Sequence, residues 1–275
     1  MRLGVVGLGL IGGSVALAAK RRLGARVVGV DRPGVLALPR AAEVADERFD
    51  VEASAGWQPA LREVDVVVLA VPVRGISTLL PRVLECGVTV TDCGSTKRQL
   101  AALAQRLSGG ERFVPGHPMA GAPEGGLSNA RADLFEGRRW LLCPERSEPS
   151  RVAAVTALAR GVGAIVTELT AVEHDRVVAL TSHVPQLVSS VLAVLAERRS
   201  ALSGAGPAFL AATRRAGGDT AMWGDIYATN HDEVAAALWD VAQELEGLAA
   251  ALDGDEPDLE PVVRLLERAR AGRSQ

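Results

Sequence analysis

The chain of 275 residues has little lysine and little cysteine. Lys20 and Lys97 are its only lysines, so arginine carries nearly all of the positive charge. The formal net charge is −3 and no basic run is present, which argues against a nucleic-acid or anionic-membrane binder. The three cysteines, Cys86, Cys93 and Cys143, are odd in number and lack metal-like spacing. The sequence therefore predicts neither a disulfide framework nor a metal site.

Long hydrophobic runs are also absent. No uninterrupted apolar run reaches the length of about 18 residues that indicates a membrane-spanning helix. The apolar start of the chain contains several glycines and is not followed by a cleavage site of small residues, which argues against a signal peptide. The simplest expectation is a cytoplasmic protein. Because 48% of the residues are apolar, we expect one large folded domain or two ordinary ones.

Residues 1–170 alternate short β-branched runs with longer helical patterns, which is typical of a parallel sheet covered by helices. We therefore predict an α/β fold with a Rossmann-type, doubly wound dinucleotide-binding domain over 1–170. In such a sheet, ligands bind at the carboxyl ends of the strands. The expected strands are 3–6, 26–30, 64–70, 88–91, 112–114, 139–143 and 164–169. The expected helices are 10–23, 76–84, 97–107 and 152–160.

No strand pattern remains after Thr170, so residues 171–275 are predicted to form an all-α domain. The segment 172–199 carries few charges and is apolar around most of its circumference, so it needs burial on most sides. That burial can come from the same chain or from a second copy, which would give a homodimer through the helical domain. The expected helices are 172–199, 207–216, 232–252 and 259–270.

A glycine motif follows the first expected strand. Gly7 suits a tight turn, Gly9 lets the backbone approach phosphate oxygens, and Gly12 permits close contact between helix and strand. The start of the helix then presents free N–H groups to a pyrophosphate. The loop expected to bind the cofactor consists of Gly7, Leu8, Gly9, Leu10, Ile11 and Gly12.

Asp31 closes the second expected strand about 20 residues after the motif, the spacing expected for the acid that binds the ribose hydroxyls. A carboxylate there repels a 2′-phosphate, so the sequence favours NAD over NADP. Arg32 leaves NADP open, because a guanidinium can accommodate that phosphate. Val71 and Pro72 follow another expected strand, and together with Ser95 they are expected to contact the dinucleotide.

His117 is the leading candidate for chemistry among the four histidines. It lies in V-P-G-H-P-M-A-G, just past an expected strand, in a loop that can hold an imidazole for general acid–base work. Ser95, in D-C-G-S-T-K, follows another strand and could exchange hydrogen bonds with this imidazole and with a substrate hydroxyl. Asp92 and Ser95 could equally cap a helix, and Lys97 is expected to be a solvated lysine in a first helical turn.

The sequence resembles the prephenate dehydrogenase family, which includes arogenate and cyclohexadienyl dehydrogenases. The matching segments are VGLGLIGGS at 6–14, AVPV at 70–73, DCGSTK at 92–97, GHPMAG at 116–121, EHDRVVALTSHVP at 173–185, TR at 213–214 and MWGDI at 222–226. This resemblance implies NAD-dependent oxidative decarboxylation of prephenate to 4-hydroxyphenylpyruvate in tyrosine biosynthesis. The alternatives are an arogenate or dual-specificity cyclohexadienyl dehydrogenase and a dinucleotide-binding protein without catalysis.

The resemblance also implies roles for individual residues. His117 would take the proton of the ring hydroxyl, and Ser95 would help to orient it. His174 and Asp175 are expected to orient the segment between the domains, and His231 is expected at the surface.

Substrate binding is expected to involve the helical domain. By resemblance, Arg214 would bind a carboxylate of the substrate, a role that a guanidinium suits. Ala211 stands where the family pattern has an acid, which leaves Arg215 as an alternative to Arg214. His183 would line the site, or be an ordinary helix histidine, and Gln186 stands where many members have another histidine.

Overall fold

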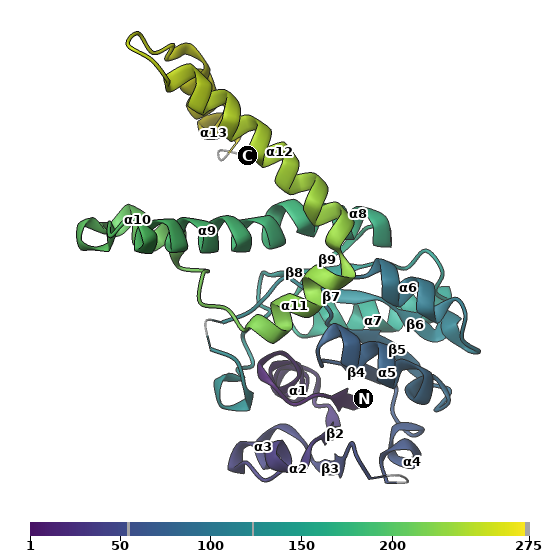
Figure 1. The fold of residues 1–275 in the computed structure, drawn as a ribbon. Coiled ribbons are helices and arrows are strands. Elements are labelled where there is room, and N and C mark those ends of the chain that lie inside the picture. Colours follow the sequence, from purple (N-terminus) through teal and green to yellow (C-terminus); the bar gives the residue numbers. More distant parts are fainter. Residues whose placement is uncertain (54–55, 123, 273–275) are drawn as a thin grey trace.

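The computed structural model describes residues 1–53, 56–122 and 124–272. Figure 1 shows a layered part built of strands and helices and a helical part whose long helices project from it.

The main sheet has six strands in the order β3-β2-β1-β4-β5-β6, and all of its pairs are parallel. The order reverses between β1 and β4, and ligands of such sheets bind at this kind of switch point. The predicted α/β, doubly wound fold is confirmed. The strands are β1 (Arg2–Val6), β2 (Arg26–Asp31), β3 (Glu47–Asp50), β4 (Val66–Leu69), β5 (Thr89–Asp92) and β6 (Phe113–Val114).

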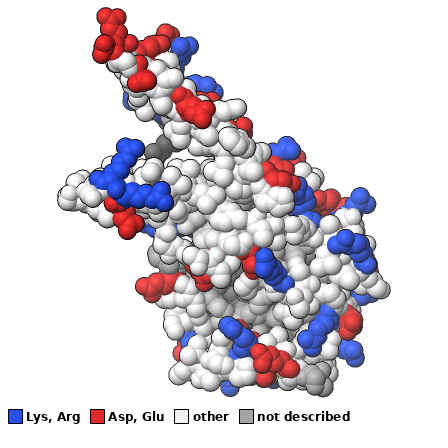
Figure 2. All heavy atoms as spheres, in the orientation of Figure 1, with Lys and Arg blue, Asp and Glu red and all other residues white. Residues whose placement is uncertain are grey.

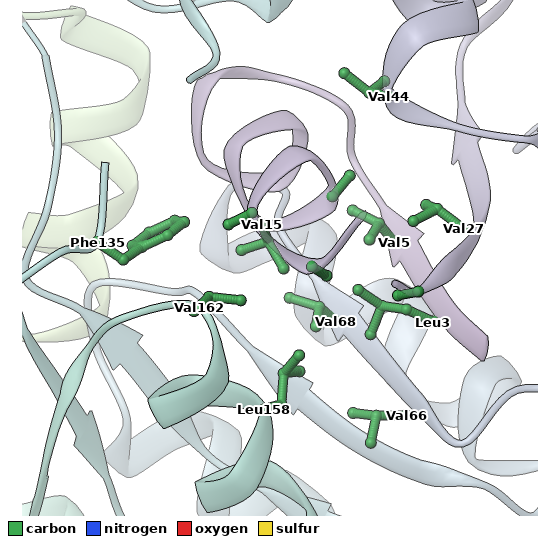
Figure 3. Packing of buried hydrophobic residues seen from close by; sticks show 14 of the residues in the cluster. Leu3, Val5, Val15, Val27, Val44, Val66, Val68, Phe135, Leu158 and Val162 are labelled. Atoms are coloured by element: carbon green, nitrogen blue, oxygen red, sulfur yellow. The ribbon is translucent and has the colours of Figure 1, made fainter. Parts of the chain in front are cut away.

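Helices cover both faces of this sheet. Successive side chains of a strand point to opposite faces, and in β1 and β4 both sets are apolar, so both faces need cover. Val5 and Val68 point into one buried cluster with Val15 and Leu158 (Figure 3). Their neighbours on β1 and β4 belong to a second cluster on the opposite face. The helices of this part are α1 (Leu10–Leu23), α2 (Pro33–Leu36), α3 (Pro39–Val44), α4 (Trp57–Leu61), α5 (Val73–Leu84), α6 (Arg98–Ala104) and α7 (Pro149–Gly161).

A second, three-stranded sheet corrects the prediction that all strands of this part share one parallel sheet. It has the order β7-β8-β9, with β7 (Gly116–Pro118) antiparallel to β8 (Arg139–Leu142), and β8 parallel to β9 (Ile165–Glu168). His117 was expected in a loop, but it is the middle residue of β7 and pairs with Leu141. A three-residue strand flanked by glycine and proline has no pattern of its own, so only its pairing with β8 makes it a strand.

The helical part begins with one continuous helix where the sequence predicted 172–199. Thr170 and Glu173 form a capping box at the start of α8 (Ala171–Val178). The residues Ala179–His183 then have π-helical geometry, and α9 (Val184–Arg198) continues the helix. The remaining helices are α10 (Pro207–Thr213), α11 (Thr220–Thr229), which the sequence did not predict, α12 (His231–Leu252) and α13 (Glu260–Gly272).

Much of the helical part is apolar but uncovered. Its buried cluster consists of Ala179, Val184 and Val234. Figure 2 shows a largely uncharged surface where α9 and α12 project, with charged side chains gathered toward their far ends. The exposed large apolar side chains of these helices include Val188, Val191, Leu192, Val194, Leu195, Trp239, Leu245 and Leu252. Burial of α9 by the same chain, one of the two predicted alternatives, therefore reaches only part of its surface.

The continuous helix from Ala171 to Arg198 would also be long and apolar enough to cross a membrane, judged by length and composition alone. Within the described residues it is the only helix that meets this test. Its first turns bury His174 and Asp175, both 0% exposed, and Asp175 is bonded to the start of α6. These contacts are those of a structural helix that joins the two parts of the chain.

Candidate active site

The carboxyl ends of the parallel strands bring the predicted cofactor residues to one edge of the sheet. Gly7 follows β1, Asp31 ends β2, Val71 follows β4 and Ser95 follows β5. Val71 also lies directly beside Gly7, because a Cβ built on Gly7 would come within 2.7 Å of a Val71 methyl group. Pro72 caps the start of α5 and is exposed.

The glycine loop has the geometry that a bound pyrophosphate requires. Gly7 has a φ of +95°, and a Cβ there would lie 2.5 Å from the carbonyl oxygen of Ala70. A Cβ on Gly12 would lie 1.8 Å from the carbonyl oxygen of Gly7, so this position is closed to any side chain. A Cβ on Gly9 would meet nothing within 4 Å, so the backbone faces open space directly before α1. The residues present therefore fit a dinucleotide.

Asp31 is fixed beside this loop. Its Oδ2 accepts a hydrogen bond from the backbone N–H of Leu8 at 2.5 Å, and its Oδ1 accepts one from the backbone N–H of Arg32 at 2.7 Å. The Arg32 side chain is exposed. The side chains of Leu8 and Leu10 are buried in the core, so these two residues can offer a ligand only their backbone.

Lys97 is not the solvated lysine that the sequence predicted. Its side chain is 0% exposed, and Nζ donates to the Asp92 carboxylate and, at 2.8 Å, to the carbonyl oxygen of Gly116. Asp92 also accepts hydrogen bonds from the backbone N–H groups of Gly94 at 2.8 Å and Gly116 at 2.9 Å. This buried pair fastens the end of β5 to the start of β7, one residue before His117.

His117 forms a chain of hydrogen bonds with His174 and Asp175 at the start of the helical part. His117 Nδ1 lies 2.9 Å from His174 Nε2, and His174 Nδ1 lies 2.8 Å from Asp175 Oδ1. The Asp175 carboxylate also accepts from the backbone N–H groups of Lys97 at 2.7 Å and Arg98 at 3.0 Å. The expectation that His174 and Asp175 only orient the interdomain segment missed this contact with His117. The adjacent His-Asp pair at the start of an apolar helix marks a polar contact there, but it does not identify His117 as the partner.

The three clustered histidines all have lowered pKa values. Burial, followed by the neighbouring His174, Lys97 and His183, lowers the pKa of His117 well below its usual value. Burial also lowers the pKa of His174, against the opposing effect of its hydrogen bond to Asp175. The pKa of His183 is lowered to about 4, again mainly by burial. All three rings are therefore neutral near pH 7, and a neutral His117 can accept a proton.

His183 packs against an aromatic wall formed by Trp223 and Tyr227 of α11. It is 1% exposed, and its ring is edge-on to Trp223, with 6.1 Å between ring centroids. Its Nδ1 lies 3.4 Å from Asn230 Nδ2, while its Nε2 is buried and has no partner within the described part of the chain. Trp223 stacks on Tyr227 with centroids 5.6 Å apart. The MWGDI segment carried no predicted role for an individual residue, so the position of Trp223 beside His183 is new.

The remaining predicted site residues lie on α9, at the end of α10 and in the connection from β5 to α6. Gln186 is 6% exposed, and a Cβ built on Gly218 would come within 3.3 Å of its Nε2. Ser95 is partly exposed between β5 and α6. Arg214 is the C-cap of α10 and Arg215 follows it; both are exposed, and neither side chain forms a hydrogen bond or ion pair with another described residue.

Comparison with known proteins matches both parts of the chain to one family. Residues 15–168 match the profile described as "Prephenate dehydrogenase, nucleotide-binding domain", and residues 170–268 match "Prephenate dehydrogenase, dimerization domain". The prephenate dehydrogenase of Bacillus subtilis is 31% identical over 97% of this chain and 73% of its own length. The cyclohexadienyl dehydrogenase of Zymomonas mobilis is 29% identical over 92% of this chain and 89% of its own length.

Solved structures agree with these matches. The prephenate dehydrogenase of Aquifex aeolicus, crystallised with hydroxyphenyl propionate and NAD⁺, is 25% identical with a TM-score of 0.84 over 100% of this chain and 97% of that one. The arogenate dehydrogenase of Synechocystis is 26% identical with a TM-score of 0.82 over 100% and 99%. The chain belongs to the prephenate dehydrogenase family.

Proposed function

We propose that this protein catalyses the NAD-dependent oxidative decarboxylation of prephenate to 4-hydroxyphenylpyruvate. The observation that supports this most is a neutral histidine, His117, hydrogen-bonded to His174 and held next to the carboxyl end of β5 by the bonds of Gly116 to Asp92 and Lys97. The glycine loop follows β1 at the same edge of this sheet. A proton acceptor next to a dinucleotide site is what oxidation of an alcohol carbon needs.

The cofactor site consists of the glycine loop and Asp31. The N–H groups at the start of α1 would hold the pyrophosphate, and the Asp31 carboxylate would accept hydrogen bonds from the ribose. NAD, when bound, supplies the acceptor for a hydride. A carboxylate at this position disfavours a 2′-phosphate, so NAD is preferred to NADP.

His117 acts as the general base. It takes the proton of the ring hydroxyl as the hydride leaves the same carbon. The bond between the ring and its carboxylate then breaks, carbon dioxide departs, and the bonding electron pair makes the ring aromatic. The ring oxygen regains the proton from His117, which gives the phenol and restores the neutral base. Ser95 orients the hydroxyl by exchanging hydrogen bonds with it. Because aromatisation makes the overall step favourable, the protein mainly has to align these groups, and the base accounts for about 10²- to 10⁴-fold in rate.

The substrate carries two carboxylates, which need cationic or hydrogen-bonding partners. His183, whose buried Nε2 has no partner among the described residues, and the Gln186 amide would supply hydrogen bonds, and Arg214 would supply the cation. Arg214→Ala is expected to raise the KM for prephenate at least about tenfold and to lower kcat less, because a carboxylate is bound in the ground state and transition state alike. If Arg215→Ala has this effect and Arg214→Ala does not, the carboxylate is assigned to the wrong arginine.

Arogenate is the second candidate substrate, because the arogenate dehydrogenase of Synechocystis matches this fold over its full length. Arogenate has an amino group in place of the side-chain keto group. The chemistry at His117 would be the same, so the choice depends on groups that contact the side chain, among which Gln186 replaces a residue that can carry charge.

The assembly we propose is a homodimer through the helical part, in the cytoplasm. Residues 170–268 match the family's dimerization domain, and α9 and α12 leave large apolar side chains uncovered. A second copy of the chain would bury them.

The experiment that tests the proposed function is the absorbance of reduced cofactor on mixing the purified protein with prephenate or arogenate, each with NAD or NADP. We expect the largest signal with prephenate and NAD. His117→Asn should lower turnover at least about a hundredfold while NAD affinity is kept. A folded wild-type protein silent in all four mixtures would contradict the proposal, and unchanged turnover in His117→Asn would remove His117 from the mechanism.

A further inference from the structure

The hydrogen bonds that start at His117 cross from one part of the molecule to the other. His117 lies on β7, whereas His174 and Asp175 lie on α8. Both distances, 2.9 Å from His117 to His174 and 2.8 Å from His174 to Asp175, are those of good hydrogen bonds. His174 and Asp175 are 0% exposed, so water does not compete for these atoms.

Asp175, at the far end of these hydrogen bonds, determines which atom is the donor in each of them. An ionised carboxylate can only accept, and Asp175 accepts from the backbone N–H groups of Lys97 and Arg98 as well as from His174. His174 Nδ1 must therefore carry the proton. In a neutral ring Nε2 then has only a lone pair, so it accepts from the Nδ1–H of His117. His117 is left with its lone pair on Nε2.

The opposite direction is costly. For His117 Nδ1 to accept, His174 would have to carry protons on both ring nitrogens and be a cation in the resting protein. Burial disfavours that form, as the lowered pKa of His174 shows. In the resting protein both rings, His117 and His174, are therefore neutral, and each has one defined tautomer.

We propose that His174 and Asp175 are positioning residues that set His117 in its Nδ1–H tautomer, with Nε2 as the proton acceptor, and that carry the charge of the proton it accepts. This inference rests on the proposed function for its kinetic consequences. As the substrate O–H bond breaks, an N–H bond forms at His117 Nε2. The Nδ1–H bond of His117 then breaks and a new one forms at His174 Nε2. The positive charge ends on His174, next to the Asp175 carboxylate.

The charged and titratable groups around His117 and His174 favour the positive charge on His174. His174 and His183, from α8 and the π-helical segment, face His117 together with the Lys97 ammonium from the β5–α6 connection, and all three disfavour a charge on His117. His174 faces Lys97 as well, but also the carboxylates of Asp175 and Asp92, which favour a charge there. Arg98 lies on the far side of Asp175, with its Nε 3.9 Å from Oδ2. A proton accepted by His117 is therefore more stable one ring further along.

The tautomer can be measured directly, without substrate. We would record the ¹⁵N resonances of the histidine rings at pH 7.5 in the full-length protein, using His231→Gln and His183→Gln to aid assignment. The expected result is a protonated Nδ1 and an unprotonated Nε2 on both His117 and His174. In Asp175→Asn the His174 tautomer should reverse or become mixed. A protonated Nε2 on His117 in the wild type would overturn the proposal.

Kinetics test whether His174 acts through His117. His174→Phe should lower kcat at least about tenfold and change the KM less than about threefold. His174→Gln offers an amide oxygen to the Nδ1–H of His117, so it should recover part of that loss. In the double variant with His117→Asn, loss of His174 should have no further effect on turnover. If the loss of turnover in the double variant equals the product of the losses in the two single variants, the proposal that His174 acts through His117 is overturned.

Glu173→Gln is the matched control. Glu173 precedes His174 and its exposed side chain closes the capping box, a role that glutamine also performs. This variant should keep wild-type kinetics; a loss as large as that of His174→Phe would assign the effect to the helix start and overturn the proposal. If the wild type oxidises neither prephenate nor arogenate, the proposed function fails, and the ¹⁵N spectrum still decides the tautomer.

Discussion

The two parts of this chain differ in how far they bury their apolar side chains. In the α/β part, the parallel sheet is covered on both faces, and two extended clusters of buried side chains result. In the helical part, the buried cluster has three residues, while Val191 is 57% exposed and Trp239 is 69% exposed. Similar apolar content thus gives a self-sufficient core in one case and an incomplete one in the other.

The difference shows where each part obtains its stability. Parallel strands need cover on both faces, and the crossover helices of the same chain supply it. The projecting helices α9 and α12 contact other helices of the chain, α13 beside α12 among them, but these neighbours leave large apolar side chains of both helices exposed (Figure 1). The buried ionisable residues are distributed differently from the apolar ones. They gather where the two parts meet and include Lys97, Asp92, His174 and Asp175.

The buried ion pair at this junction should show the largest effect on stability. Lys97→Met removes the cation beside Asp92, which leaves an uncompensated buried carboxylate, and is expected to cost about 3–5 kcal/mol in the free energy of unfolding. Lys20→Met breaks the partly exposed pair with Asp46, 2.7 Å long, and is expected to cost about 0–1 kcal/mol. Urea denaturation of the two variants measures both. Equal losses would mean that Lys97 is no better buried than Lys20.

The uncovered face of α9 should show a smaller effect that depends on protein concentration. Val191→Glu places a charge in the proposed dimer interface and is expected to raise the dimer dissociation constant at least about a hundredfold, or about 3 kcal/mol. Leu38→Glu is the matched control, because Leu38 is 39% exposed in the α/β part. Sedimentation velocity at several concentrations distinguishes the two. Should Val191→Glu remain as dimeric as Leu38→Glu, α9 is covered by something other than a second copy.

Local patterns were sufficient for the α/β framework. The helix predicted over 10–23 is α1 (Leu10–Leu23), since a glycine motif marks its start and Gly24, with a φ of 60°, ends it. The doubly wound fold and the family were likewise predictable from sequence and are confirmed. The roles assigned to His117, Ser95 and Arg214 stay predictions, because no ligand or measurement bears on them.

Features that depend on distant parts of the chain were not predictable. β7 is a strand only because β8, more than twenty positions later, pairs with it. Lys97 is buried because its ammonium reaches Asp92 and Gly116 once β5 and β7 lie side by side. The contact of His174 with His117 joins residues 57 positions apart, so no window along the sequence contains both. Such contacts are set by topology, and they concentrate at the candidate site.

The histidines at the junction should make stability depend on pH, and the contribution of any single ring should be the smallest of the three effects. His117, His174 and His183 have lowered pKa values in the folded state. An unfolded chain binds protons at these rings below about pH 6.5, whereas the folded chain does not, so the free energy of unfolding should fall as the pH drops from about 6.5. For His183, the fall should continue to its folded pKa of about 4. Each ring contributes a slope of at most about 1.4 kcal/mol per pH unit. Urea denaturation between pH 7 and pH 5 measures this slope, which should be shallower in His183→Gln. If that variant keeps the wild-type slope, the loss of stability in acid does not come from the histidines buried between the two parts.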